Sequence, residues 1–153
     1  MSRPFVCFSL SVLSIVWSLG CSSGQMENPD WPERYAASGT VTWQGKPVEG
    51  ADVTFMSDSG NSTAVGKTDS AGRFVLTTHV DGDGAVAGPQ KVAVRRVNIV
   101  DKTPKDVDLS AGGVALPPEI TWIVPEEFSN PATSGLTAVV NEDGPNEYTF
   151  DLK

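Results

Sequence analysis

The chain contains a single histidine, His79, which limits the proton-transfer chemistry available to it near neutral pH. His79 stands at the end of an expected strand, beside a glycine-rich loop at residues 81–88. Nothing in the sequence places Ser134, Thr137 or another hydroxyl beside a base. We therefore interpret His79 as a solvated strand-end residue. The sequence predicts no catalytic residues and a protein that is not an enzyme.

Two carboxylates, Asp81 and Asp83, alternate with Gly82 and Gly84 in a spacing that can direct oxygen atoms at one hard cation. The next ligand position is occupied by Ala85, and no glutamate follows at the distance that a calcium loop requires. This segment is therefore expected to be a turn. The sequence predicts no metal site and no cofactor.

The amino terminus has the features of an export signal. Arg3 precedes a stretch of apolar and small residues at 5–19, and no further charge occurs before Glu27. Fifteen residues suit the apolar region of a signal peptide and fall short of the roughly 20 that span a bilayer. Residues 1–20 are therefore predicted to be a signal peptide.

The sequence Ser18-Leu19-Gly20-Cys21 resembles the lipobox of bacterial lipoproteins, although its leucine lies two residues before the cysteine instead of three. The resemblance implies a diacylglyceryl group on Cys21. Ser18 and Gly20 also stand at the spacing used by an ordinary signal peptidase. Both routes cleave between Gly20 and Cys21.

Cysteine number bears on the choice between these routes. Cys7 would be lost with the signal peptide, and Cys21 would then be a lone thiol in an oxidising compartment. Lipidation explains that residue without further assumptions, and the two or three acyl chains of a lipoprotein anchor stably. Residues 21–36 are predicted to form the lipidated cysteine and a flexible tether. The expected location is the cell envelope, with a lipid anchor in a bacterial membrane, at the outer membrane or the periplasmic face.

Composition predicts the class of the remaining domain, residues 37–153. The chain has 15 glycines and 11 prolines, which favour frequent turns over long helices, so the domain is expected to be all-β. Its formal net charge of −8 makes nucleic acid an unsuitable partner, because binding phosphates requires clustered Lys and Arg.

Short alternating runs separated by turn residues predict seven strands and a further short extended segment. The inward positions are assigned to apolar residues such as Val41, Phe55 and Phe74. Residues 91–99 read as one long strand with two apolar faces, which indicates a central strand or one covered by a loop. The expected runs lie at 39–43, 51–56, 62–68, 73–78, 91–99, 120–124, 136–140 and 146–152. Residues 101–118 lack periodicity, and loops of this length tend to be functional or disordered.

The segments 39–41, 45–51 and 68–74 together resemble the carboxypeptidase-regulatory-like, or transthyretin-like, domain. Residues 125–137 and 146–152 resemble the ending of small bacterial envelope lipoproteins that carry this domain. The resemblance covers about half of the mature chain. It implies a seven-stranded Greek-key β-sandwich that serves as an accessory, adhesive or structural module.

Two functions follow as hypotheses. The first is a structural or protein-interaction lipoprotein that performs no chemistry. The second is a carbohydrate-binding module for an envelope or environmental polysaccharide that uses Trp122 or the loop at 101–118, since flat aromatic rings suit pyranose rings. Trp122 shares its parity with Ile120 and Val124, which favours burial for all three, and Trp43 shares a face with Val41.

Overall fold

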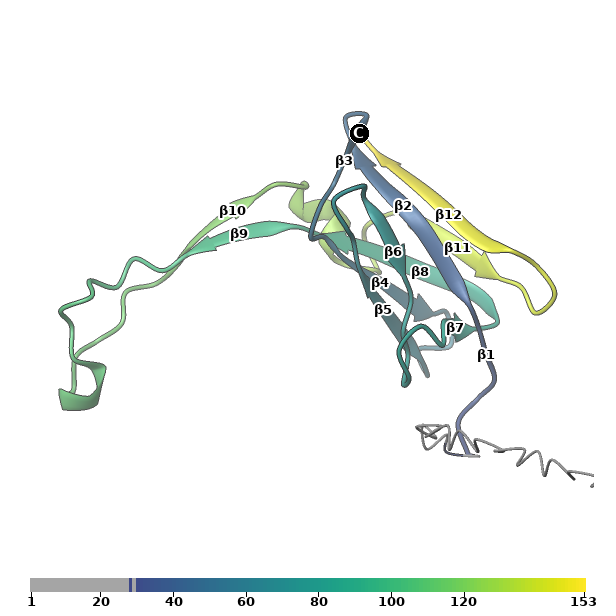
Figure 1. The fold of residues 1–153 in the computed structure, drawn as a ribbon, viewed down its shortest axis with the longest axis horizontal. Helices are drawn as coiled ribbons and strands as arrows, with labels where there is room; N and C mark the ends of the chain where they lie inside the picture. The colour runs from purple at the N-terminus through teal and green to yellow at the C-terminus, as the bar shows by residue number, and fades with distance from the viewer. Residues whose placement is uncertain (1–27, 29) are drawn as a thin grey trace, which may run out of the picture.

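The computed structural model describes residues 28 and 30–153, and strands dominate it (Figure 1). The expectation of an all-β protein is confirmed. The strands are β1 (Arg34–Tyr35), β2 (Ala37–Trp43), β3 (Lys46–Pro47), β4 (Asp52–Ser57), β5 (Thr63–Lys67), β6 (Arg73–Val75), β7 (Ala85–Val86), β8 (Gly88–Arg95), β9 (Val97–Val100), β10 (Glu119–Trp122), β11 (Leu136–Val140) and β12 (Asn146–Leu152). Two short 3-10 turns, η1 (Leu109–Ala111) and η2 (Glu126–Ser129), complete the described elements.

Two sheets form the body of the molecule. The first has the order β11-β8-β4-β5, with antiparallel pairing throughout. In the second, β12 runs parallel to β2, and the other edge of β2 pairs with β6 and β3. Val65 and Thr77 exchange two main-chain hydrogen bonds of 2.8 Å, which connect β5 to the chain just beyond β6. The sheets are therefore joined along one side and enclose a shared interior in a sandwich-like arrangement.

Apolar side chains at every second position of the strands fill that interior. Phe55 of β4 is completely buried, and its ring centroid lies 5.3 Å from that of Tyr148 and 6.0 Å from that of Phe150 on the opposite sheet. Full burial of a side chain of this size contributes roughly 1.5–3 kcal/mol. The inward positions expected for Val41 and Phe74 are confirmed. The buried apolar core consists of Ala37, Val41, Val48, Ala51, Val53, Phe55, Ala64, Phe74, Leu76, Ala85, Val92, Val94, Val124, Ala138, Val140, Phe150 and Leu152.

Local interactions determine the turn between β2 and β3 and hold together the buried segment around Thr68. Gln44 and Gly45 both have positive φ, 51° and 74°, which is the requirement of the two-residue turn that joins β2 to β3. Just after β5, the hydroxyl of Thr68 accepts a hydrogen bond from the Ala51 N–H at 2.7 Å and donates one to the Val48 carbonyl at 2.6 Å. Thr68 is buried, so this hydroxyl satisfies two main-chain groups that have no access to water.

The predicted strand at 91–99 is wrong as a single element. It is interrupted at Arg96, where β8 ends and β9 begins. The part within the body is central as expected, because β8 lies between β11 and β4. One of its faces is buried, with Gln90, Val92 and Val94, whereas on the other face only Ala93 is buried. Beyond Arg96 the chain leaves the body. Arg95 is exposed at the end of β8, and because successive residues of a strand alternate, a continued strand would turn Arg96 towards the interior, where an unpaired charge is costly.

The predicted burial of Ile120 is also wrong, because β10 pairs with β9 outside the body and leaves Ile120 51% exposed. Val124, four residues later, is completely buried as expected. The alternating pattern predicted burial for both residues, because the pattern does not show that the chain enters the body between them. The strand expected at 73–78 ends at Val75 as β6, although Leu76 is still buried.

Residues at the end of the predicted tether lie against the body. The Arg34 and Tyr35 backbones pair with Val86 and Ala85. The Trp31 ring stacks on His79 with centroids 4.0 Å apart, and Arg34 Nε lies 2.7 Å from Asp83 Oδ2. The chain is therefore fixed to the sandwich from Trp31 onward.

Candidate functional site

The most unusual feature of the molecule is a long hairpin that projects from the sandwich (Figure 1). We call it the arm and define it as residues 97–123, which comprise β9, β10 and the connection that holds η1. In the register of its two strands, Ile120 lies opposite Ile99 and Trp122 opposite Val97. The remaining pairs are Thr121 with Asn98 and Glu119 with Val100.

These pairs give the arm two unlike faces, because directly opposed residues share a face and successive residues alternate. One face carries Val97, Ile99, Ile120 and Trp122, and we call it the apolar face. The other carries Asn98, Val100, Glu119 and Thr121. Ile99 is 56% exposed and Ile120 51% exposed. The cross-strand isoleucine pair of the apolar face is therefore half open to solvent, with no element of the described chain packed over it.

Exposed apolar side chains are concentrated in the arm. Nine large apolar residues are exposed in the described part of the chain, and six of them are arm residues, namely Ile99, Val100, Val114, Leu116, Ile120 and Ile123. Scattered exposed apolar residues are ordinary, whereas a group of them on one projecting element marks an interaction surface or a groove.

Local polar contacts hold the outer arm in shape. Lys102 Nζ lies 2.6 Å from Glu119 Oε2 across the hairpin, and the Leu116 N–H donates to the Thr103 hydroxyl at 3.0 Å. Asp108 caps η1: it accepts a hydrogen bond from the Ser110 hydroxyl and from the Ser110 and Ala111 N–H groups. These donors, the hydroxyl first, hold the pKa of Asp108 below its ordinary value. The loop expected at 101–118 is thus the ordered outer part of the arm.

Arg96 fixes the direction in which the arm leaves the sandwich. Its Nε donates a hydrogen bond to the Glu49 carbonyl at 2.8 Å, and its Nη1 donates one to the Val97 carbonyl at 3.0 Å. Its own carbonyl accepts hydrogen bonds from the Ile123 and Val124 N–H groups, at 2.9 and 3.3 Å. One residue therefore connects both strands of the arm to the body.

Trp122, the predicted ligand-contact residue, lies at the base of the arm and is partly buried. The Arg95 guanidinium carbon lies 5.9 Å from the centroid of its ring. A cation at this distance is attracted to the face of an indole. The structure therefore places Trp122 on the apolar face next to Arg95, and it places Trp43, the other tryptophan considered, against Phe128 at the edge of the core.

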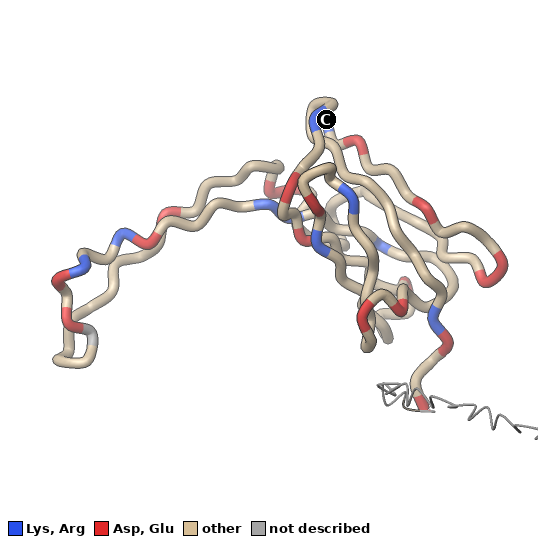
Figure 2. Tube along the Cα trace, in the orientation of Figure 1, with Lys and Arg blue, Asp and Glu red and all other residues tan. Residues whose placement is uncertain are grey.

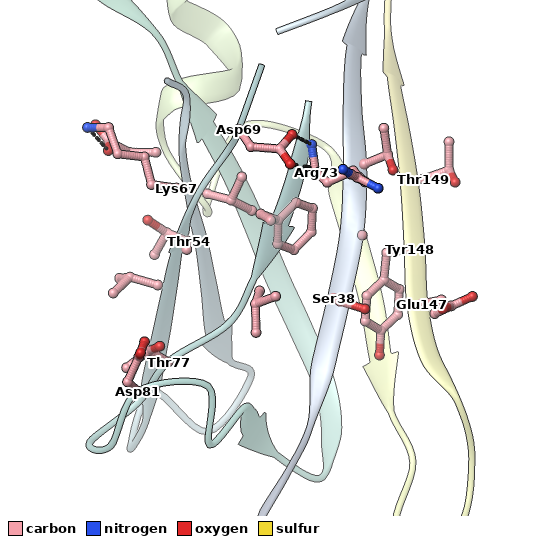
Figure 3. A pocket seen from close by; sticks show the side chains of 18 residues that line it. Ser38, Thr54, Lys67, Asp69, Arg73, Thr77, Asp81, Glu147, Tyr148 and Thr149 are labelled. Atoms are coloured by element: carbon pink, nitrogen blue, oxygen red, sulfur yellow. Dashed lines mark hydrogen bonds and ion pairs between the residues drawn. The ribbon is translucent and has the colours of Figure 1, made fainter. Parts of the chain in front are cut away.

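A separate hollow of about 1020 Å³ lies over β2, β4, β5, β6 and β12 (Figure 3). Its charged side chains include Lys67, which pairs with Asp52 at 3.2 Å, and Arg73, which pairs with Asp69 at 3.3 Å. Figure 3 shows the second pair at one end of the hollow and Thr77 with Asp81 at the other. The lining also includes hydroxyl side chains, two exposed valines, Val65 and Val75, the buried Val53 and Phe74, and the carboxylates of Asp81 and Glu147. Backbone N–H donors, first that of Arg73, lower the pKa of Asp69.

The predicted turn at 81–84 is held by Asp83. Its carboxylate accepts hydrogen bonds from the Thr78, His79 and Val80 N–H groups, at 2.6, 3.0 and 3.0 Å. Burial acts to raise the pKa of Asp83, but these donors and the Arg34 guanidinium outweigh it, so that the pKa lies below its ordinary value. Within the described chain, no group of three or more potential metal-binding side chains comes together.

Gly20 and Cys21, the predicted cleavage and lipidation residues, lie outside the described residues, as does Cys7. Among the residues that are described, no helix has the length and apolarity needed to cross a membrane.

Sequence reasoning located the arm's tip as an irregular loop but missed the arm itself. The available signal was the pair Arg95-Arg96, which interrupts an otherwise apolar run. The ion pair between Arg34 and Asp83 carried no sequence signal, because its partners are 49 residues apart and are brought together by the β1–β7 pairing. Comparisons of the whole chain with protein families, with curated proteins and with solved structures find no match.

Proposed function

We propose that this chain is a non-catalytic lipoprotein of the bacterial cell envelope, and that it uses the arm to bind another protein of the envelope. The observation that carries the proposal is the apolar face, which projects from the sandwich with Ile99 and Ile120 half exposed.

The energetics of the arm favour a bound partner. A two-stranded ribbon is at best marginally stable in water unless a third strand or a packed surface supports it. Covering the exposed half of one isoleucine side chain would contribute roughly 1 kcal/mol. A partner that covers the apolar face therefore gains binding energy and stabilises the ribbon. The polar contacts of Lys102 and Thr103 keep the arm extended before the partner arrives.

Membrane attachment is the second part of the proposal, with Cys21 as the lipidated residue. Its support is the apolar segment at 5–19 followed by Ser18-Leu19-Gly20-Cys21. Mass spectrometry of the mature amino terminus tests it. The expected result is a chain that begins at Cys21 and carries a diacylglyceryl group, whereas an unmodified thiol at Cys21 would overturn the anchoring.

Pull-down from detergent-solubilised membranes tests the arm. The full chain is compared with two variants that add the same charge to adjacent residues of β10: Ile120→Lys on the apolar face and Thr121→Lys on the opposite face. We expect the wild type and Thr121→Lys to recover the same envelope protein and Ile120→Lys to lose it. Repeated recovery of no partner by the wild type would count against the interaction role.

We also propose that the body is a seven-stranded Greek-key sandwich of the transthyretin-like, or carboxypeptidase-regulatory-like, type. Its support is that seven strands of three or more residues make up the body, namely β2, β4, β5, β6, β8, β11 and β12. Gly45, which has positive φ in the first hairpin, and the buried Thr68 lie in segments that carry the sequence resemblance. An experimental structure of the body would test this assignment through its strand order.

Polysaccharide binding is the second candidate function. The surface that suits it best is the hollow in Figure 3. Hydroxyls and carboxylates, such as those of Thr54, Thr149 and Glu147, suit the hydroxyl groups of sugars. Trp122 is a poorer platform because Arg95 already lies over its ring. A glycan array with the full chain separates the two candidates: absence of binding at millimolar glycan removes this one.

A further inference from the structure

The hollow in Figure 3 is formed by residues on the outer face of neighbouring strands of the sandwich. Directly opposed residues of paired strands share a face, so one row runs from Glu147 through Ser38 to Val75. On the adjoining strands, Val65 lies opposite Thr54. Five strands about 4.8 Å apart give a width of roughly 19 Å. This width and the volume of about 1020 Å³ suit an oligomer better than a single small molecule.

The hollow offers hydroxyl groups that are open to a ligand. Four of them form no hydrogen bond with any residue that the structure describes, namely those of Ser38, Thr40, Thr54 and Thr149. Val65 and Val75 lie among them and are more than half exposed. Hydroxyls that both donate and accept, next to apolar methyl groups, match the hydroxyl and C–H surfaces of a sugar ring.

The backbone of the hollow disfavours a peptide as the ligand. Strand β2 is paired on both sides, with β12 and β6, and β4 is paired on both sides, with β8 and β5. An extended peptide therefore finds no free strand edge at β2 or β4 to which it could add as a further strand. Recognition at these strands depends on side chains.

The charge of the hollow indicates which kind of sugar it suits. Its lining has two more acids than bases. The two bases, Lys67 and Arg73, already pair with Asp52 and Asp69, at 3.2 and 3.3 Å. The two remaining acids, Asp81 and Glu147, form no ion pair with any residue that the structure describes, and Figure 3 shows them on opposite sides of the hollow.

We propose that the hollow binds a polysaccharide that carries free amino groups, such as an oligomer of glucosamine. Its ammonium groups pair with Asp81 and Glu147, and its ring hydroxyls bond to the open hydroxyls of the strands. This inference rests on the second candidate function, polysaccharide binding, and specifies its ligand. A neutral polysaccharide leaves both carboxylates without a counter-charge, and an acidic one meets an excess of negative charge.

Isothermal titration calorimetry of the full chain in detergent tests the preference with tetramers of glucosamine and of N-acetylglucosamine. The two tetramers share ring and linkage and differ in the charge of the nitrogen, at a pH between the ordinary pKa values of carboxylates and amines. We expect the glucosamine tetramer to bind about five-fold more tightly, as exposed charge pairs allow. This advantage should decrease as the salt concentration is raised from about 0.05 to 0.5 M.

Substitutions of the two carboxylates locate the site. Glu147→Gln and Asp81→Asn should each weaken binding of the glucosamine tetramer about two- to five-fold and leave the N-acetylated tetramer unchanged. Asp143→Asn is the matched control, because it removes the same charge from an exposed residue outside the hollow. Acidic residues are distributed over the whole sandwich (Figure 2), so an effect of overall charge would appear in the control as well.

The outcomes separate this inference from polysaccharide binding in general. Equal affinity for the two tetramers overturns the preference for amines and leaves polysaccharide binding in place. If neither tetramer binds but the glycan array returns another polysaccharide, the candidate function holds and this inference fails; if the array is also empty, both fail. An equal loss in Asp143→Asn overturns the hollow as the site. Capped tetralysine that binds as tightly as the glucosamine tetramer overturns a saccharide as the preferred ligand.

Discussion

Replacing Asp83 with asparagine should remove the contact that fixes the amino-terminal segment to the sandwich. The side chains of Arg34 and Asp83 are only 5% and 11% exposed, and their charged atoms are 2.7 Å apart. The same carboxylate holds three backbone N–H donors of the turn at residues 78–80. Asparagine keeps one oxygen acceptor but presents an N–H₂ group where Arg34 and main-chain donors approach.

The expected cost is about 3 kcal/mol at pH 7. Breaking a buried ion pair by removing one partner costs about 3–5 kcal/mol. Asparagine retains part of the hydrogen bonding, which places the estimate at the lower end. For a domain near 120 residues this corresponds to a fall of roughly 10 °C in Tm. Urea unfolding of the full chain, followed by tryptophan fluorescence, measures the free energy directly, because Trp31 reports on the segment that Arg34 holds.

The pH dependence provides a second readout. The pKa of Asp83 is lowered in the folded state, so its stabilising contribution is present above the unfolded pKa, about 3.9, and is lost as the pH falls through the folded pKa. The difference between wild type and Asp83→Asn should therefore be complete at pH 7 and shrink below about pH 4.

Asp58→Asn is the matched control, because Asp58 also pairs with a base, Lys91, at 3.0 Å but is 61% exposed. An exposed pair contributes about 0–1 kcal/mol. The reasoning is refuted if Asp83→Asn unfolds within 0.5 kcal/mol of Asp58→Asn at pH 7, an interval of the order of ordinary surface effects, about 0.5 kcal/mol.

Three further substitutions test other parts of the structure. Thr68→Val should cost about 2 kcal/mol in urea unfolding, because two buried main-chain groups lose the hydroxyl that they share; a neutral result would contradict that role. Gly84→Ala should cost at least about 2 kcal/mol, because its φ is +85° and a β-carbon would collide with the Tyr35 carbonyl; wild-type stability would show that β1 does not pack there. Arg96→Met should leave the sandwich nearly as stable but speed amide exchange at Val97–Val100 several-fold, since it releases the base of the arm; unchanged exchange would mean that the hairpin ladder alone sets its direction.

The alternation of apolar and polar residues correctly predicted the strands that lie within the two sheets of the body. Val41, Phe55 and Phe74 lie inward as expected, because apolar side chains that repeat every second residue bury one face of a strand wherever that strand is placed. The turn at Gln44-Gly45 likewise depends on local chemistry, because both of its residues have positive φ. Local rules of this kind depend on a few adjacent residues and do not require the topology to be known.

The arm could not be predicted, because its position depends on partners remote in sequence. Ile99 and Ile120 have the pattern of core residues, and only their pairing with each other, away from the second sheet, leaves them exposed. Arg96 directs that departure through the Glu49 carbonyl, 47 residues earlier. Contacts of this range leave no periodic signal in the sequence.

The attachment of Trp31–Tyr35 to the lower end of the sandwich sets a geometric limit on an anchored protein (Figure 1). Six residues lie between Cys21 and Asn28, so the chain between these two residues spans at most about 25 Å. In Figure 1 the arm leaves the sandwich at the end of β8 that lies away from β1, extends sideways and bends at its tip back towards the level where the chain enters, so a bilayer below the sandwich would have the arm extending alongside it. The protein would then reach its neighbours laterally, in the plane of the membrane, and its range would be set by the length of one hairpin.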